Sequence, residues 1–180
     1  MAALFEVTVN ALMALVFATA AVGKLRDATT FEGVVANFQL LPEALVRPFA
    51  RALPWLELLV AVLVWAPGAL GVIAQSAGAA LLAMFAFAMA VNIRRGRREI
   101  DCGCFQTAGR QALAWPLVVR NLGLAGALLA AAAWGAPGGD GMVWANGLAG
   151  GLALFLIHLA AGELTALRTR GQTPMKGARA

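Results

Sequence analysis

The sequence is poor in charged residues and contains only two cysteines and one histidine. Asp, Glu, Lys and Arg make up 13% of its 180 residues, against roughly 25% in soluble globular domains. Hydrophobic residues make up 61% even without counting glycine, so too few polar side chains are present to cover a water-exposed surface. These shortages argue against a soluble enzyme, a disordered chain and a secreted disulfide scaffold. They favour a small multi-pass membrane protein.

Five apolar runs are present, and runs of about 20 apolar residues cross a bilayer as helices. They cover residues 4–22, 49 or 53 to 65, 69–93, 113–134 and 143–164. The second run is the shortest, and Arg51 and Pro54 lie at its start. Residues 18–20 resemble a signal-peptide cleavage site, but no Lys or Arg precedes the first run, as a signal peptide requires. We therefore expect an all-α integral membrane protein, a bundle of about five transmembrane helices.

The remaining segments complete the expected organisation. In residues 29–52 apolar side chains recur at helical spacing, which predicts one or two amphipathic helices along the membrane interface rather than a solvated loop. In the fifth run, Gly147 and Gly151 form a GxxxG pattern that allows close packing within the bundle. A single transmembrane helical domain is expected over residues 1–167, followed by a basic, disordered tail over 168–180.

The basic residues predict the orientation of the bundle. The net charge is +5, but the charges fall between apolar runs and not on one helix face, so we expect no nucleic-acid partner. Thirteen of the 14 Lys and Arg residues lie in residues 23–52, 94–112 and the tail, and none lies in the alternate connections. Arg120, inside the fourth run, is the exception. By the positive-inside rule the C-terminus is cytoplasmic.

The two cysteines form a C-x-C pair, Cys102-Gly103-Cys104. A disulfide across such a pair closes a small, strained ring, and strained disulfides are easily reduced. So short a loop adds little stability, which favours a redox role over a structural one. Metal binding is the rival interpretation, but the single His158 lies far along the chain and we expect no metal. A pair of unreactive residues at a loop end is the third interpretation.

Five polar residues fall within or beside the apolar runs, where charges are costly and usually have a role. They are Lys24, Glu57, Arg120, Asn121 and His158. If the runs alternate in direction, all five lie on the same side of the membrane as the cysteines. Glu57 and Arg120 have similar expected depths and are candidates for an ion pair. Arg120 as a snorkelling side chain, and His158 as a packing residue rather than a proton carrier, are the alternatives.

The motifs together resemble those of the MauE family of methylamine-utilisation membrane proteins, which has DoxX-like relatives. The matching residues are GKLRD at 23–27, FQLLP at 38–42, LPWLE at 53–57, DCGCF at 101–105 and Arg120-Asn121. Each motif is loose alone, but their order and spacing make the resemblance specific. Together the motifs cover most of residues 4–165. The tail lies outside the resemblance.

The resemblance implies a bacterial inner-membrane protein that acts in maturation of the periplasmic methylamine dehydrogenase. The implied partners are a membrane-anchored thioredoxin-like protein of the MauD type and the disulfide-rich small subunit of the dehydrogenase. The implied activity is thiol–disulfide exchange through Cys102 and Cys104, which makes the chain a candidate oxidoreductase. The expectation of a quinone cofactor comes only from a comparison of architecture with other membrane disulfide-forming enzymes. A non-catalytic scaffold for the maturation partners is the alternative function.

Orientation and implied function conflict. Substrate disulfides form in the periplasm, whereas the charge distribution puts the cysteine pair on the cytoplasmic side. Three explanations are open. The pair lies near the midplane and exchanges electrons across the membrane, the protein breaks the charge rule, or the number of spans differs by one.

Overall fold

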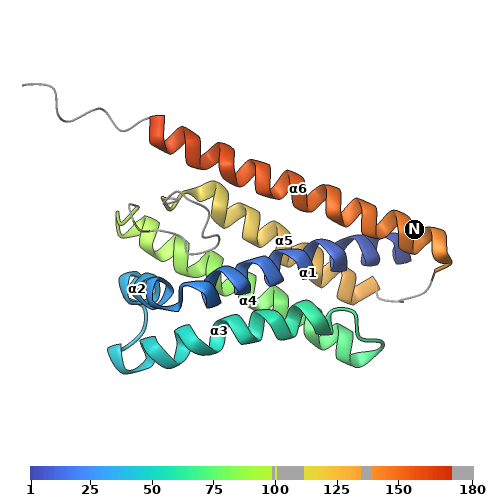
Figure 1. The fold of residues 1–180 in the computed structure, drawn as a ribbon, viewed down its shortest axis with the longest axis horizontal. Helices are drawn as coiled ribbons and strands as arrows, with labels where there is room; N and C mark the ends of the chain where they lie inside the picture. Colours follow the sequence, from blue (N-terminus) through green and yellow to red (C-terminus); the bar gives the residue numbers. More distant parts are fainter. Residues whose placement is uncertain (99, 101–111, 135–138, 172–180) are drawn as a thin grey trace, which may run out of the picture.

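The structure is a computed structural model that describes residues 1–98, 100, 112–134 and 139–171, with side chains described up to Leu164. Within these residues the chain forms six helices and no strand. They are α1 (Ala2–Arg26), α2 (Ala28–Phe38), α3 (Glu43–Leu63), α4 (Ala69–Arg94), α5 (Trp115–Trp134) and α6 (Gly141–Gly171). Five long helices lie along one axis, and the short α2 lies at one end of them (Figure 1). The predicted all-α membrane fold is confirmed.

Four helices are long and apolar enough to cross a membrane: α1, α4, α5 and residues 141–164 of α6. They match four of the five predicted spans to within a few residues at most ends. The fifth prediction falls on α3, which is 21 residues long but carries Glu43, Arg47, Arg51 and Glu57. The first half of α3 is therefore too polar to count as a span by composition. The helix also ends at Leu63, two residues before the predicted boundary at Trp65.

The predicted amphipathic segment forms α2 and the first turns of α3. Asp27 separates α1 from α2 and caps α2, because its Oδ1 accepts a hydrogen bond from the Thr30 N–H at 3.0 Å. The helix ends at Gln39, which adopts a left-handed conformation with φ 50°. Pro42 is the N-cap residue of α3, which begins at Glu43, and a proline there removes no N–H that the helix would need. The segment therefore folds as two helices, and the second continues into the bundle without a break.

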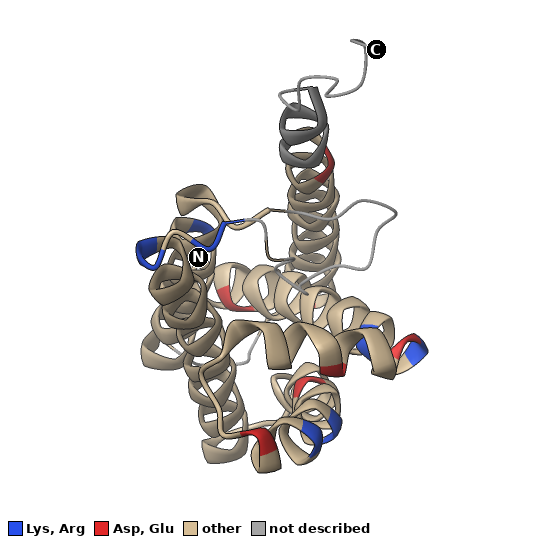
Figure 2. Cartoon of the chain, turned by 90° about the vertical axis from the view of Figure 1, so that its left-hand side faces the viewer, with Lys and Arg blue, Asp and Glu red and all other residues tan. Residues whose placement is uncertain are grey.

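The two ends of the bundle differ in charge. We call one the basic end, where α1 and α4 end and α3 and α5 begin, and the other the turn end, which holds residues 64–68 and the start of α6. Figure 2 looks onto the basic end, where the coloured Lys and Arg residues gather at helix ends and in α2–α3. No described Lys or Arg lies at the turn end, where Glu6 and Asp140 are found.

The core is built around α1. In its most apolar stretch 61% of residues are buried, against 17% in α6. Met13 and Phe17 of α1 are almost fully buried and pack with Val60 of α3, Leu82 of α4 and Leu128 of α5. By contrast α6 leaves Leu152, Leu156 and Ile157 exposed, as expected of a helix that faces lipid. Its last described residues, 168–171, begin the predicted tail, and 172–180 lie outside the described chain.

Candidate functional site

Cys102 and Cys104 lie in residues 101–111, outside the part of the chain that the structure describes. The flanks of this segment are described. After α4, Gly96 adopts a positive φ of 76°, a conformation that glycine accepts without steric cost. The Leu113 N–H then donates a hydrogen bond to the Arg98 carbonyl at 2.9 Å. The two flanks of the cysteine segment therefore meet at the basic end.

One flank is also held against the end of α2. The Asn92 side chain of α4 donates to the Phe38 carbonyl at 3.2 Å, and the Arg97 guanidinium donates to Gln39 Oε1 at 2.8 Å. Carbonyls at a helix C-terminus lack partners within their own helix, so such donors stabilise the end of α2. The connection between α2 and α3 is thereby fixed beside the start of the cysteine segment.

Lys24 and Glu57 form a buried ion pair between α1 and α3. Lys24 Nζ lies 2.7 Å from Oε1 and 2.8 Å from Oε2 of Glu57, and the two side chains are 4% and 1% exposed. The ammonium also lies 5.5 Å from the ring centroid of Phe31 in α2 and 5.4 Å from that of Phe85 in α4. Both distances are within the range of cation–π attraction. One charged group thus contacts side chains from α2, α3 and α4.

This pairing corrects one sequence-based expectation and places the remaining candidates. Glu57 pairs with Lys24 and not with Arg120, because the faces of α1 and α3 meet and those of α3 and α5 do not make a comparable contact. Arg120 of α5 is half-buried and lies close enough to His158 of α6 to act on it electrostatically. Asn121 is buried at 3% exposure in α5.

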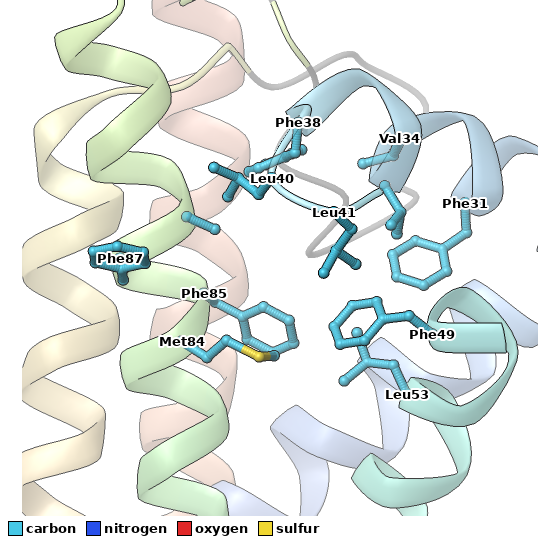
Figure 3. Close-up of a pocket in the computed structure, with 12 residues that line it drawn as sticks. Phe31, Val34, Phe38, Leu40, Leu41, Phe49, Leu53, Met84, Phe85 and Phe87 are labelled. Atoms are coloured by element: carbon cyan, nitrogen blue, oxygen red, sulfur yellow. The ribbon is translucent and has the colours of Figure 1, made fainter. Parts of the chain in front are cut away.

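An apolar pocket of about 230 Å³ lies beside the ion pair, between α2, α3 and α4 (Figure 3). Two of its walls are Phe31 and Phe85, the rings that face Lys24. None of its lining residues within the described chain carries a charged or polar side chain, so the pocket suits an apolar chain or ring. The lining residues are Phe31, Val34, Val35, Phe38, Leu40, Leu41, Phe49, Leu53, Met84, Phe85, Phe87 and Ala88.

Sequence reasoning missed a second buried polar group, formed by Glu6 and Asn10 of α1 and Gln75 of α4 at the turn end. The signal was available, since Glu6 and Asn10 are four residues apart and share a helix face. Among described residues no group of three or more His, Cys, Asp or Glu side chains suits a metal ion. The cysteines lie outside that set, so the absence of a metal stays a prediction.

The apolar helices, the buried ion pair within them and the charge difference between the two ends define a multi-pass helical membrane protein. The chain belongs to the MauE family, because the family model described as "Methylamine utilisation protein MauE" matches residues 1–137. The resemblance noted from the sequence motifs is therefore confirmed.

Relatives with the same name extend the match beyond the family model. The chain is 45% identical over 171 residues to the methylamine utilization protein MauE of Paracoccus denitrificans, a match covering 89% of each chain. It is 42% identical over 161 residues to that of Paracoccus versutus, covering 88% of this chain and 86% of the relative. It is 48% identical over 117 residues to the protein of the same name from Methylorubrum extorquens, a match covering 65% of this chain and 62% of the relative. No solved structure matches the chain significantly.

Proposed function

We propose that this protein, an accessory protein of methylamine utilisation, is a membrane thiol–disulfide redox component. In this proposal Cys102 and Cys104 cycle between dithiol and disulfide with a thioredoxin-like, membrane-anchored partner of the MauD type. The exchange supports disulfide formation in the small subunit of the periplasmic methylamine dehydrogenase. The protein itself lies in the bacterial inner membrane with its C-terminus in the cytoplasm.

A single exchange step needs no added oxidant, whereas net formation of each substrate disulfide releases two electrons, which in this proposal pass to an acceptor of the quinone class. A thiolate on one protein attacks a sulfur of the disulfide on the other, and a mixed disulfide forms while the second sulfur leaves as a thiolate. The remaining thiol of the attacking pair then displaces the first sulfur. The attacking pair thereby becomes a disulfide and the other pair becomes a dithiol. Two protons move from the first pair to the second. The small ring of a C-x-C disulfide favours this exchange because ring strain makes it easy to reduce.

The observation that carries the proposal is the position of the only two cysteines. They are separated by one residue, Gly103, in a segment whose two flanks are hydrogen-bonded to each other at the basic end. The start of that segment is also held to the end of α2. The entry to and the exit from the segment are thus fixed at the basic end, where this proposal places the exchange with the partner.

The test replaces the chain, in a host that makes methylamine dehydrogenase, by a Cys102→Ser, Cys104→Ser double variant. We expect the dehydrogenase small subunit to stop accumulating in its oxidised form while the variant reaches the membrane in normal amount. Each single Ser variant keeps one thiol and should trap a mixed disulfide with the thioredoxin-like partner, detectable as a band that disappears on reduction. Ser76→Ala, at an exposed residue of α4, is the matched control.

Two results would replace the proposal. Normal accumulation of the oxidised subunit with the double-Ser variant would favour the scaffold function, in which the helices hold the partners and the cysteines do no chemistry. One metal ion per purified chain, lost on substitution of either cysteine, would favour a metal-handling protein.

A further inference from the structure

A buried polar cluster lies at the turn end, at the opposite end of the bundle from the flanks of the cysteine segment. Glu6 and Asn10 of α1 and Gln75 of α4 are 7%, 5% and 1% exposed. Eighteen residues of helix, roughly 27 Å, separate Glu6 from Lys24 on α1, and Lys24 is already paired with Glu57. Among the described residues, no Lys or Arg side chain and no N-terminal ammonium forms an ion pair with the Glu6 carboxylate, which lies in the apolar bundle.

Some oxygen atoms of the cluster have no hydrogen-bond partner among the described residues. The Asn10 amide donates to the Val64 carbonyl at 2.9 Å, which fixes its Oδ1 toward Gln75. Gln75 Nε2 lies 3.0 Å from Asn10 Oδ1 and 3.5 Å from Glu6 Oε1, the latter at the limit of a hydrogen bond. Within the described chain, Glu6 Oε2 and Gln75 Oε1 are buried and have no partner. The cluster thus has more acceptors than donors and an excess negative charge.

We propose that Glu6, Asn10 and Gln75 bind a monovalent alkali cation. Carboxylate and amide oxygens are the ligands that hard cations prefer. One carboxylate with two neutral amides balances a single positive charge, whereas a divalent ion would leave a buried excess of positive charge, which is costly. An uncompensated carboxylate inside a membrane bundle is costly for the same reason.

The spacing of the three side chains fits a shared ion. The O and N atoms of a glutamine amide are assigned from their hydrogen bonds, so the two orientations are interchangeable. With the Gln75 amide turned over, its oxygen, which has no partner in the first orientation, takes the place of Nε2, 3.0 Å from Asn10 Oδ1 and 3.5 Å from Glu6 Oε1, and its NH2 group takes the buried place of Oε1. Oxygens at right angles around an ion about 2.4 Å away are about 3.4 Å apart. The bound ion then joins α1 to α4, next to the end of α3.

The test measures thermal unfolding of the purified full-length chain in detergent, in NaCl, KCl and choline chloride at equal ionic strength. Tryptophan fluorescence is a suitable signal, because Trp65 follows the Val64 carbonyl in the chain and stacks on Trp144 at 5.9 Å. NaCl should raise Tm saturably, by on the order of 5 °C at a large excess over Kd, and choline chloride should not. A response to KCl supports the same class of ion.

Glu6→Gln removes the charge and should abolish the response to Na⁺. Glu43→Gln, at an exposed carboxylate of α3, should keep it. If Glu6→Gln does not fold, direct binding of radioactive ²²Na⁺ to the wild-type chain decides, with competition by unlabelled NaCl but not by choline chloride. Equal Tm in all three salts, an unchanged response in Glu6→Gln, or a stronger response to CaCl₂ would overturn the site. None of these results depends on the cysteines, so the redox proposal stands or falls separately.

Discussion

At the scale of single residues, the buried pair Lys24–Glu57 sets the largest expected effect on stability. Lys24→Met leaves the Glu57 carboxylate buried without a partner, and we expect a loss of about 3–5 kcal/mol in the free energy of unfolding. The double variant Lys24→Met, Glu57→Leu removes both charges, so most of that loss should be recovered. Unfolding in mixed detergent micelles measures both variants. Equal losses for the single and double variants would show that packing of the Lys24 stem, and not the charge pair, matters here.

Asp27 gives α2 a dependence on pH. Hydrogen bonds from Thr30 hold the pKa of the Asp27 carboxyl below its usual value of 3.8. Because the folded-state pKa is the lower one, the ionised cap stabilises α2 above the usual pKa, and this contribution is lost as the pH falls through the lowered pKa. The protection of the Thr30 amide against hydrogen exchange, corrected for the intrinsic rate, should fall in that acidic range.

A pair of substitutions separates this cap from other acid effects. Asp27→Asn keeps a capping oxygen and should retain protection of the Thr30 amide at neutral pH and lose its acid dependence. Asp27→Ala should lose protection at every pH. The same acid dependence in Asp27→Asn as in the wild type would mean that another group titrates.

Sequence reasoning singles out Lys24 and Glu57, which the structure buries at the basic end, but does not show how they pair. Lys24 and Glu57 stand out because charges are rare in apolar runs. Position along a run gives the depth of a side chain, but its partner depends on how each helix is rotated about its axis. That rotation follows from packing of the whole bundle, so the candidate pairing of Glu57 with Arg120 is wrong and Lys24 is the partner. The cluster around Glu6 was missed because amides and a carboxylate near the start of a run resemble an interfacial end.

At the scale of helices, glycines set the distance between α1 and α6. A Cβ at Gly147 would lie 2.6 Å from Val7 Cγ1, and one at Gly151 would meet Ala11 and the Thr8 carbonyl. The GxxxG pattern in the sequence predicted such an approach, and the contact between α1 and α6 confirms it. The side-chain pattern alone did not say which helix was the partner.

Substitution at this contact tests it. Gly151→Ala forces backbone atoms of α1 away, and we expect a loss of about 1–3 kcal/mol in the free energy of unfolding. Gly162→Ala, on the same helix with no atom within 4 Å of the added Cβ, should change it by no more than about 0.5 kcal/mol. Unfolding in mixed micelles compares the two. A similar loss for both would trace the effect to the helix itself rather than to its contact.

The helices themselves were predictable to different degrees. Long apolar runs predict α4 and α5 nearly to their ends and the membrane-spanning parts of α1 and α6, whose C-terminal turns extend beyond the runs, because hydropathy identifies the part of a helix that crosses a bilayer. The start of α3 was not predictable in this way, since charged residues at 43, 47 and 51 look interfacial. The helix nevertheless continues from these charged turns into a buried half, because one of its faces, with Val46, Ala50 and Leu53, packs inside the protein.

At the scale of the whole molecule, the difference between the two ends predicts an orientation. The basic end holds the flanks of the cysteine segment, so the positive-inside rule puts Cys102 and Cys104 on the cytoplasmic side. A membrane-impermeant maleimide should then label them only after the inner membrane is opened, with or without prior reduction. Labelling in intact cells after reduction would instead place a disulfide in the periplasm and contradict the charge rule for this loop.

A cysteine at the turn end provides the matched control. Gly141→Cys in the double-Ser background lies at an exposed residue at the start of α6, with no atom within 4 Å of its Cβ. It should be labelled from outside in intact cells. Labelling of both positions from the same side would mean that the number of membrane crossings between them is even.

The contact between α1 and α6 also constrains how the protein is made. The first helix to be synthesised, α1, is fully packed only when α6, the last of the six, has been made, because Gly147 and Gly151 of α6 cover Val7, Thr8 and Ala11 of α1. Helices that enter the membrane one after another must therefore leave the central one partly uncovered until translation is nearly complete. Such an intermediate leaves Val7, Thr8 and Ala11 of α1 uncovered, so a chain stalled before α6 should be a preferred target for membrane quality control.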